Sequence, residues 1–288
     1  KIITFKLLIN LANATYIGVG KHKMLKQMKK LLQKVGFLIL FTGLCYVSCA
    51  NTITVTNTND TGMGSLREAV GSLAVNGDSI RFSSNLLSNG SDTIILQNEL
   101  FINKSLTIIG LYNSSDSLYI SGNNNFRIFS IYSVGTFSID SVILINGNGN
   151  GLGLSPGYGG AILFENSISL FVNNSIIRGN NADYGGGIYT SSNYLSLDNT
   201  TLVNNNAAYD GGGACSDNNA SSVILFNSLI SNNTAGDDGG GVYCSLVTVN
   251  NSIINENSAP NGSGGGIFSE SSSNSISISN SSLIDNNS

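Results

Sequence analysis

Acidic and aromatic residues recur at one point of a repeated motif, and their types and spacing are the ones in this sequence that could do chemistry. The motif is a run of glycines that ends on an apolar residue. Asp210 and Asp238 each lie four residues before that apolar residue in successive motifs. Asp183 and Asp237 each lie five residues before it. If successive motifs stack as parallel strands about 4.8 Å apart, Asp210 and Asp238 come within about 5 Å of each other.

Three roles are open to this row of aspartates. A closely spaced carboxylate pair suits a retaining glycoside hydrolase, which makes Asp210 and Asp238 the candidate catalytic residues. Carboxylate oxygens also suit Ca²⁺, so calcium is the one cofactor that we weigh, with four candidate ligands: Asp183, Asp210, Asp237 and Asp238. The third role is structural, because Asp before Gly commonly forms a turn.

Two tyrosines lie directly beside the row and are the candidate ligand-binding residues. Tyr184 follows Asp183, and Tyr209 precedes Asp210. Their rings could carry a sugar, although the sequence has no Trp, which offers the largest aromatic surface for stacking.

The glycine motifs themselves define a repeat of 25 to 28 residues, since their closing apolar residues are Ile162, Ile188, Ala214, Val242 and Ile267. A fixed period of this size is typical of a solenoid. Each repeat also carries a pair of apolar residues followed by Asn, which we place at Ile176-Ile177 to Asn180, Leu202-Val203 to Asn206, Leu229-Ile230 to Asn233, Ile253-Ile254 to Asn257 and Leu283-Ile284 to Asn287. So much Asn, Ser, Thr and Gly would destabilise helices. The pattern therefore predicts an all-β fold, a single-stranded parallel β-helix whose Asn residues hydrogen-bond along the stack.

The cysteines of the repeats, Cys215 and Cys244, lie one and two residues after the closing apolar residue of their motifs. Successive residues of a strand point to opposite faces. We therefore expect two buried free thiols; a disulfide between them is the alternative.

The distribution of charge excludes several functions. Residues 51–288 hold all 17 acidic residues but only five of the 13 Lys and Arg residues, a net charge of −12. Such a chain repels nucleic acid and anionic membranes. Arg178 is the one basic residue of the glycine-motif repeats from about 157 onward, which argues against a polysaccharide lyase that needs a basic catalytic residue. The only histidine, His22, lies in the N-terminal segment, so we expect no His-based catalysis or metal site in the mature chain.

The first 50 residues read as a leader. Residues 28–50 combine a positive start, an apolar run and small residues before Ala50, which predicts a secretory signal peptide cleaved after Ala50. Lipid attachment at Cys49 is the alternative. The apolar run is too short to span a membrane, so we expect no transmembrane helix in the mature chain. Residues 1–27 precede the natural start at Met28, and we expect them to lie outside the native fold.

A short helix is predicted before the repeats. Ser65 and Glu68 have the spacing of a capping box, and an apolar stripe follows at Leu66, Ala69, Val70 and Leu73. We expect this helix, with the strand at 51–58, to cover the open end of the solenoid. Arg67 and Glu68 are then surface and capping residues rather than catalytic ones.

Two stretches resemble known families. The N-terminal part, 51–110, resembles the CSLREA domain in four places: residues 54–60 (TVTNTND), 64–69 (GSLREA), 78–82 (DSIRF) and 104–110 (KSLTIIG). Within the predicted parallel β-helix of 111–288, the repeats from about 157 to 288 resemble those of chlamydial polymorphic outer-membrane proteins, with GGAI at 159–162 and FVNN at 171–174. Together these resemblances imply a right-handed, pectin-lyase-like β-helix with an N-terminal cap.

The resemblances also imply a location and a role. They place the chain as a secreted passenger at the bacterial cell surface or outer membrane, adhesive or structural, with a host-cell surface, matrix or polysaccharide as its partner. Because the last repeat ends without a cap, we expect the chain to be a fragment of a longer protein. The alternative function is a polysaccharide-active enzyme, a glycoside hydrolase rather than a lyase, or a carbohydrate-binding module.

Overall fold

The computed structural model describes residues 50–111, 116–150, 155–218, 221–270 and 275–288. The predicted leader, the signal segment up to residue 49 and the alternative lipid site at Cys49 lie outside these ranges. Within them, no helix is long and apolar enough to cross a membrane.

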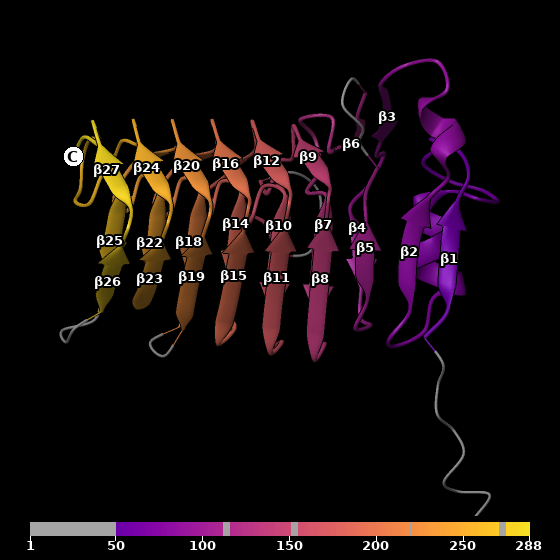
Figure 1. The fold of residues 1–288 in the computed structure, drawn as a ribbon, viewed down its shortest axis with the longest axis horizontal. Helices are drawn as coiled ribbons and strands as arrows, with labels where there is room; N and C mark the ends of the chain where they lie inside the picture. Colours follow the sequence, from indigo (N-terminus) through magenta and orange to yellow (C-terminus); the bar gives the residue numbers. More distant parts are fainter. Residues whose placement is uncertain (1–49, 112–115, 151–154, 219–220, 271–274) are drawn as a thin grey trace, which may run out of the picture. The chain divides into compact units, whose positions relative to one another are not determined.

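Residues 50–288 form an all-β parallel solenoid of about eight turns with about 5% helix, as the sequence predicts. Figure 1 shows the strands of successive turns lying side by side. The first ladder is a nine-strand sheet of β1 (Thr52–Val55), β2 (Ser79–Phe82), β5 (Thr107–Ile109), β8 (Thr136–Asp140), β11 (Ser169–Asn173), β15 (Tyr194–Asp198), β19 (Ser222–Phe226), β23 (Leu246–Asn250) and β26 (Ile276–Ser279).

Two further ladders complete the main turns. The seven-strand sheet contains β4 (Leu100–Ile102), β7 (Phe129–Tyr132), β10 (Ile162–Glu165), β14 (Ile188–Thr190), β18 (Ala214–Ser216), β22 (Val242–Cys244) and β25 (Ile267–Ser269). The eight-strand sheet contains β3 (Asp92–Ile95), β6 (Leu118–Ser121), β9 (Ile143–Ile145), β12 (Ile176–Arg178), β16 (Thr201–Val203), β20 (Leu229–Ser231), β24 (Ile253–Asn255) and β27 (Ser282–Ile284). A small fourth ladder, which the repeat pattern did not predict, joins β13 (Asn181–Ala182), β17 (Asn206–Ala207) and β21 (Thr234–Ala235).

The glycine motifs set the register of the seven-strand sheet, as predicted. Their closing apolar residues pair in one continuous column along the stack: Ile162, Ile188, Ala214, Val242 and Ile267. The column continues towards the N-terminus through Phe129 and Leu100, although no glycine run precedes either residue. All of these residues except Ile267 are at most 1% exposed. Burying such a column in every turn supplies the apolar core that no single turn has.

The apolar pairs of the eight-strand sheet correct the predicted alignment by one residue in two repeats. The inward residue is Leu202, paired with Ile177, and Leu283, paired with Ile254, rather than Val203 and Ile284. A slip of one residue would move every side chain of a strand to the other face. Leu202 is buried, whereas Leu283, in the last turn, is 44% exposed. In both repeats a hydroxyl residue precedes the inward residue where the others carry an aliphatic one.

The same correction changes which asparagines stack. The ladder runs through the buried residues Asn180, Asn205, Asn233 and Asn257 and ends at the partly buried Asn286. Asn205 and Asn286 therefore take the places predicted for Asn206 and Asn287. From Asn205 onward, each side-chain oxygen accepts from the backbone N–H and the amide of the Asn one turn earlier; Asn233 Oδ1, for example, accepts both from Asn205 at 3.0 Å. The Asn180 oxygen accepts instead from the Gly147 N–H at 2.7 Å. The amide of Asn205 also donates to the Ile177 carbonyl at 2.9 Å. Every member therefore satisfies backbone groups that the bend would otherwise leave unpaired.

The N-terminal helix forms, but it widens after one turn. In α3 (Leu66–Glu68) the Ser65 hydroxyl accepts from the Glu68 N–H at 3.2 Å, and Glu68 accepts from Gly64 N–H at 2.7 Å, one residue earlier than in a capping box. A π-helical turn, η2 (Ala69–Leu73), follows. Its wider spacing turns Leu73 away from the predicted apolar stripe, and that side chain is 52% exposed.

Basic side chains fasten this helical segment, in which Leu66, Ala69 and Val70 are buried in the core. Lys104 donates to the Val70 and Gly71 carbonyls of η2 at 3.2 and 2.7 Å. Arg67 donates to Asp60 at 2.6 Å and to the carbonyls of Asn98 and Glu99. Arg67 thus connects the helical segment to the chain just before β4. A short 3₁₀ turn, η3 (Ser84–Leu87), follows β2.

The asparagine ladder yields a stability prediction. Asn205→Ala removes a buried amide and leaves several polar groups unpaired, so we expect the free energy of unfolding in urea to fall by about 2–4 kcal/mol. Asn206→Ala is the matched control, because Asn206 is exposed and its amide makes one hydrogen bond, to Asn181, at 2.8 Å. We expect that change to cost less than about 1 kcal/mol. Equal losses would show that the ladder does not fix the stack.

Candidate ligand-binding surface

The outer side of the seven-strand sheet carries a second row of apolar and aromatic residues. In each strand the residue after the inner apolar one points outward, and these residues pair in register: Leu163, Tyr189, Cys215, Tyr243 and Phe268. Leu163, Tyr189 and Cys215 are at most 5% exposed although they face outward. A further layer of side chains must therefore cover them.

That layer includes Tyr132, Tyr158 and Tyr184. Tyr209 extends it along the corner, by which we mean the bend before each glycine run, and Tyr158, Tyr184 and Tyr209 are the corner tyrosines. The rings of Tyr158 and Tyr184 stack with centroids 5.4 Å apart, and those of Tyr184 and Tyr209 with centroids 5.1 Å apart. Tyr158 also lies over Tyr189, at 4.6 Å. Further along the sheet Tyr243 and Phe268 stack at 5.5 Å. We call these corner tyrosines and the outer row together the tyrosine face.

Glycine is required where the corner meets the sheet. Gly185 and Gly211, each the first glycine of its run, have φ of +64° and +66°, a conformation that favours glycine. A Cβ on Gly211 would also lie 2.6 Å from the Cβ of Cys215. The glycine runs therefore do more than mark the repeat, because they let the corner pack directly onto the outer row.

Asp210 and Asp238 lie on neighbouring turns, as the spacing predicts, but each serves the backbone. The Asp210 carboxylate accepts from the Asp238 N–H at 3.0 Å, and the Asp238 carboxylate accepts from the Ser263 N–H at 2.7 Å. Asp183 accepts from the Asn150 amide at 2.8 Å. These partners lie 25 to 33 residues away, so the carboxylates join neighbouring turns of the solenoid rather than closing a local turn.

The four aspartates do not form one cluster. Tyr209 lies between Asp183 and Asp237 in the stack, donating its N–H to the Asp183 carbonyl and accepting from Asp237 N–H. In the described ranges no three His, Cys, Asp or Glu side chains converge as a metal site requires. The donor set expected for calcium is therefore not assembled, and calcium stays a hypothesis from the sequence.

The charge of Asp210 is disfavoured where it lies. Burial raises the pKa of the Asp210 carboxyl above its ordinary value, although the hydrogen bond from Asp238 N–H lowers it. The charges of Asp238 and Asp237 raise that pKa further. Like-charge repulsion along the row thus destabilises the ionised form.

Carboxylates at the C-terminal ends of the strands, opposite the glycine runs, form contacts that the sequence pattern did not predict. The Tyr189 hydroxyl donates to Asp217 at 3.3 Å, and the Tyr243 hydroxyl donates to Glu270 at 3.0 Å. Asp217 and Glu270, like Glu165, lie three residues after the closing apolar residue of their motifs. The same spacing argument would have found them if it had been applied after the glycine runs as well as before.

The two cysteines face opposite ways and are free, as predicted. Cys215 lies in the outer row among tyrosines, whereas Cys244 lies in the inner core. Burial raises the pKa of the Cys215 thiol, and it raises that of Cys244 to about 12. Both thiols therefore stay protonated and unreactive near neutral pH.

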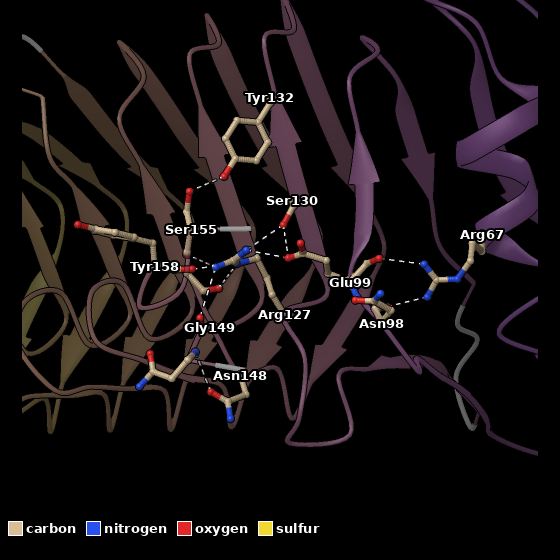
Figure 2. A network of polar contacts seen from close by, with 12 residues as sticks. Arg67, Asn98, Glu99, Arg127, Ser130, Tyr132, Asn148, Gly149, Ser155 and Tyr158 are labelled. Atoms are coloured by element: carbon tan, nitrogen blue, oxygen red, sulfur yellow. Dashed lines mark hydrogen bonds and ion pairs between the residues drawn. The ribbon is translucent and has the colours of Figure 1, made fainter. Parts of the chain in front are cut away.

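Arg127 anchors the end of the tyrosine face through a buried polar network (Figure 2). Its guanidinium donates to the Glu99 carboxylate at 2.8 Å and to the Ser130 hydroxyl at 2.9 Å. It also donates to the Tyr158 and Ser155 carbonyls, at 2.9 and 2.8 Å.

The network fixes the position of Tyr158. Ser155 receives a further hydrogen bond from the Tyr132 hydroxyl at 2.9 Å, so the segment that carries Tyr158 is held from both sides. The Arg127 and Glu99 side chains are only 2% and 8% exposed. Burial lowers the pKa of Arg127, which the Glu99 charge partly restores. The composition of this segment gave no signal that one arginine would hold it.

In comparisons with known proteins, the sequence matches no family model and no curated protein.

The Arg127–Glu99 pair yields a second prediction. Arg127→Met leaves a buried carboxylate without its counter-charge, so we expect the free energy of unfolding to fall by about 3–5 kcal/mol. In a double-mutant cycle with Glu99→Gln, we expect a coupling energy above about 1.5 kcal/mol. The less buried pair Arg67 and Asp60, whose side chains are 27% and 12% exposed, is the control. It is tested as Arg67→Met and Asp60→Asn, and we expect a coupling energy below about 1 kcal/mol. Similar coupling in both cycles would contradict the anchoring role of Arg127.

Asp210 yields a third prediction. Because its folded-state pKa is raised, ionised Asp210 destabilises the fold at pH 7, and this penalty disappears below the unfolded-state pKa of about 3.9. Asp210→Asn keeps an oxygen for the Asp238 N–H. We expect this variant to be at least as stable as the wild type at pH 7, with the advantage vanishing by about pH 3. Urea unfolding across this range measures it, with Asp198→Asn on β15 as the control of equal charge. A loss of stability at pH 7 would refute the repulsion.

Proposed function

We propose that this chain is a secreted bacterial β-helix, displayed at the cell surface or outer membrane, that acts as an adhesin-like protein through its tyrosine face. The single observation that carries the proposal is the layer of stacked aromatic residues on the outside of the seven-strand sheet. Tyr209 is 46% exposed, and Tyr184 and Tyr243 are partly exposed. Tyrosine is enriched at protein interfaces, because its ring buries a large area while its hydroxyl bonds to polar groups.

The rest of the chain suits this role. The proposed signal peptide at 28–50 and the short motifs that resemble surface passengers support export. The stacked turns repeat a surface at a fixed spacing. Such a stack could also serve only as a structural spacer at the cell surface, which is the role that we propose if the tyrosine face binds no ligand. We further propose that the coil is right-handed and that residues 51–110 form a CSLREA-like cap, which the burial of Leu66, Ala69 and Val70 in the core supports.

A polysaccharide-active enzyme or carbohydrate-binding module is the second candidate. It is favoured by the stacking of Asp210 and Asp238 beside the rings of Tyr184 and Tyr209 and by the raised pKa of Asp210, which a general acid needs. Against a hydrolase, both carboxylates are engaged by backbone N–H groups. Against a lyase, Arg178 lies on β12 of the eight-strand sheet, its guanidinium 5.7 Å from the Tyr119 ring centroid.

The fourth prediction tests attachment. We expect beads coated with the purified protein to bind host cells or extracellular matrix, and the double change Tyr184→Ala and Tyr209→Ala to reduce binding about tenfold or more, since each removes a large aromatic contact. Phe171→Ala and Tyr194→Ala form the matched control, because these aromatics pair on the nine-strand sheet.

Two outcomes would redirect the proposal. Equal losses in the two double variants would exclude the tyrosine face as the binding surface. Oligosaccharide binding or hydrolysis that disappears in Asp210→Ala and Asp238→Ala, with cell attachment unchanged, would favour the second candidate.

A further inference from the structure

Carboxylates follow the seven-strand sheet at a two-turn spacing. The position three residues after the closing apolar residue is occupied in successive turns by Glu165, Ser191, Asp217, Ser245 and Glu270. Neighbouring parallel strands lie about 4.8 Å apart, so the three carboxylates recur about every 9.6 Å along the stack. Asp217 and Glu270 are exposed, and Glu165 is half-buried.

Tyrosines occupy the turns between them. Tyr189 and Tyr243 each donate their hydroxyl to the carboxylate of the next turn, Asp217 and Glu270. The unit of tyrosine and carboxylate therefore repeats with the same two-turn period. A carboxylate has about four acceptor positions, so one tyrosine hydroxyl leaves room for a guanidinium or ammonium group. Tyr243 and Phe268 add a stacked aromatic surface beside the last carboxylate.

The chain itself has few basic residues that could neutralise this row of carboxylates. After Arg127, which is buried against Glu99, the only basic residue in the sequence is Arg178, on the eight-strand sheet. Arg127 supplies some positive charge to Glu165, since the Glu165 charge raises the pKa of Arg127. Positive charge for Asp217 and Glu270 would therefore come from a ligand. Arg and Lys groups are attracted both to carboxylates and to the faces of tyrosine rings.

The spacing selects the shape of a cationic ligand. A polyproline-II helix has three residues per turn and rises about 3.1 Å per residue, so every third side chain returns to the same edge after about 9.3 Å. Over the two intervals from Glu165 to Glu270 the mismatch is only about 0.6 Å. A β-strand repeats a face every ~6.7 Å, and an α-helix after seven residues repeats at ~10.5 Å, so both fit worse.

We infer that the tyrosine face binds a polypeptide segment in the polyproline-II conformation with a basic residue at every third position. The segment lies along the stack, places its basic groups at Glu165, Asp217 and Glu270, and packs its proline rings on Tyr243 and Phe268. Aromatic surfaces are the usual partners of such segments. This inference rests on the proposed function, because it names the ligand of the same surface.

The test compares two peptides of identical composition. One repeats the triplet Pro-Pro-Arg, and the other carries the same arginines in one block. Binding to the full-length protein is measured by fluorescence anisotropy at low and at about 150 mM salt. We expect the triplet peptide to bind about tenfold more tightly than the block peptide. Asp217→Asn and Glu270→Gln should each weaken it about three- to tenfold.

Asp198→Asn on β15 is the control for charge, since it removes one negative charge from a different sheet, and we expect it to leave the affinity within about twofold of the wild type. Thermal melts confirm that each variant folds. Equal binding of the two peptides, an equal loss in Asp198→Asn, or no saturable binding of either peptide would overturn the inference. So would preference for a cationic oligosaccharide over the triplet peptide.

The outcome for the peptide is separable from that of the proposed function. If cell attachment is lost in Tyr184→Ala with Tyr209→Ala but the triplet peptide does not bind, the ligand class is wrong and the adhesive surface stands. If the peptide binds as expected but attachment is unaffected, the surface has a basic polypeptide partner and the adhesive role is wrong.

Discussion

The backbone of each turn hydrogen-bonds to the turns on either side, and this in-register pairing is the constraint on which the rest of the structure depends. It places residues at equivalent positions of successive repeats directly above one another, so a column has one environment along its whole length. The inner column from Leu100 to Val242 is buried because every turn contributes an apolar residue at that position. The asparagine ladder uses the same constraint, since each amide bonds to its equivalent in the next turn.

Stacking also brings like charges together. The spacing of these charges differs between the two ends of the strands in the seven-strand sheet. Before the glycine runs, Asp210 and Asp238 occupy adjacent turns, where burial and repulsion raise the pKa of Asp210. After the strands, serines separate the carboxylates, so Glu165, Asp217 and Glu270 lie two turns apart. A separation of about 9.6 Å exceeds the Debye length of about 8 Å at physiological salt, which weakens their repulsion.

The tyrosine face shows how one buried charge can support an exposed surface. Arg127 is placed by the solenoid next to Glu99 of the preceding turn, and its remaining donors hold the carbonyls of the segment that carries Tyr158. Tyr158 in turn covers Tyr189 and stacks on Tyr184. The buried ion pair therefore contributes mainly to the shape of the surface, because a desolvated pair gives little net stability by itself.

The sequence by itself determined the fold class, the period, the column of closing apolar residues and the opposite facing of Cys215 and Cys244. These features follow from short-range patterns, namely the glycine spacing and the alternation of side chains along a strand. Such patterns depend only on neighbouring residues and can be recognised without the tertiary structure. It also placed Asp210 and Asp238 on neighbouring turns, because a repeat converts sequence spacing into distance.

Only the tertiary structure decided the register of Leu202 and Leu283, the membership of Asn205 in the buried ladder and the exposure of Leu73. Each depends on which of two adjacent residues meets the core or where a helix widens, and the local pattern fits both choices. The contacts of Arg127 with Glu99 and Ser155 were equally hidden, since they join residues about 28 apart on different turns. The tyrosine face itself needed the structure, because only folding lays the corner tyrosines over the outer row.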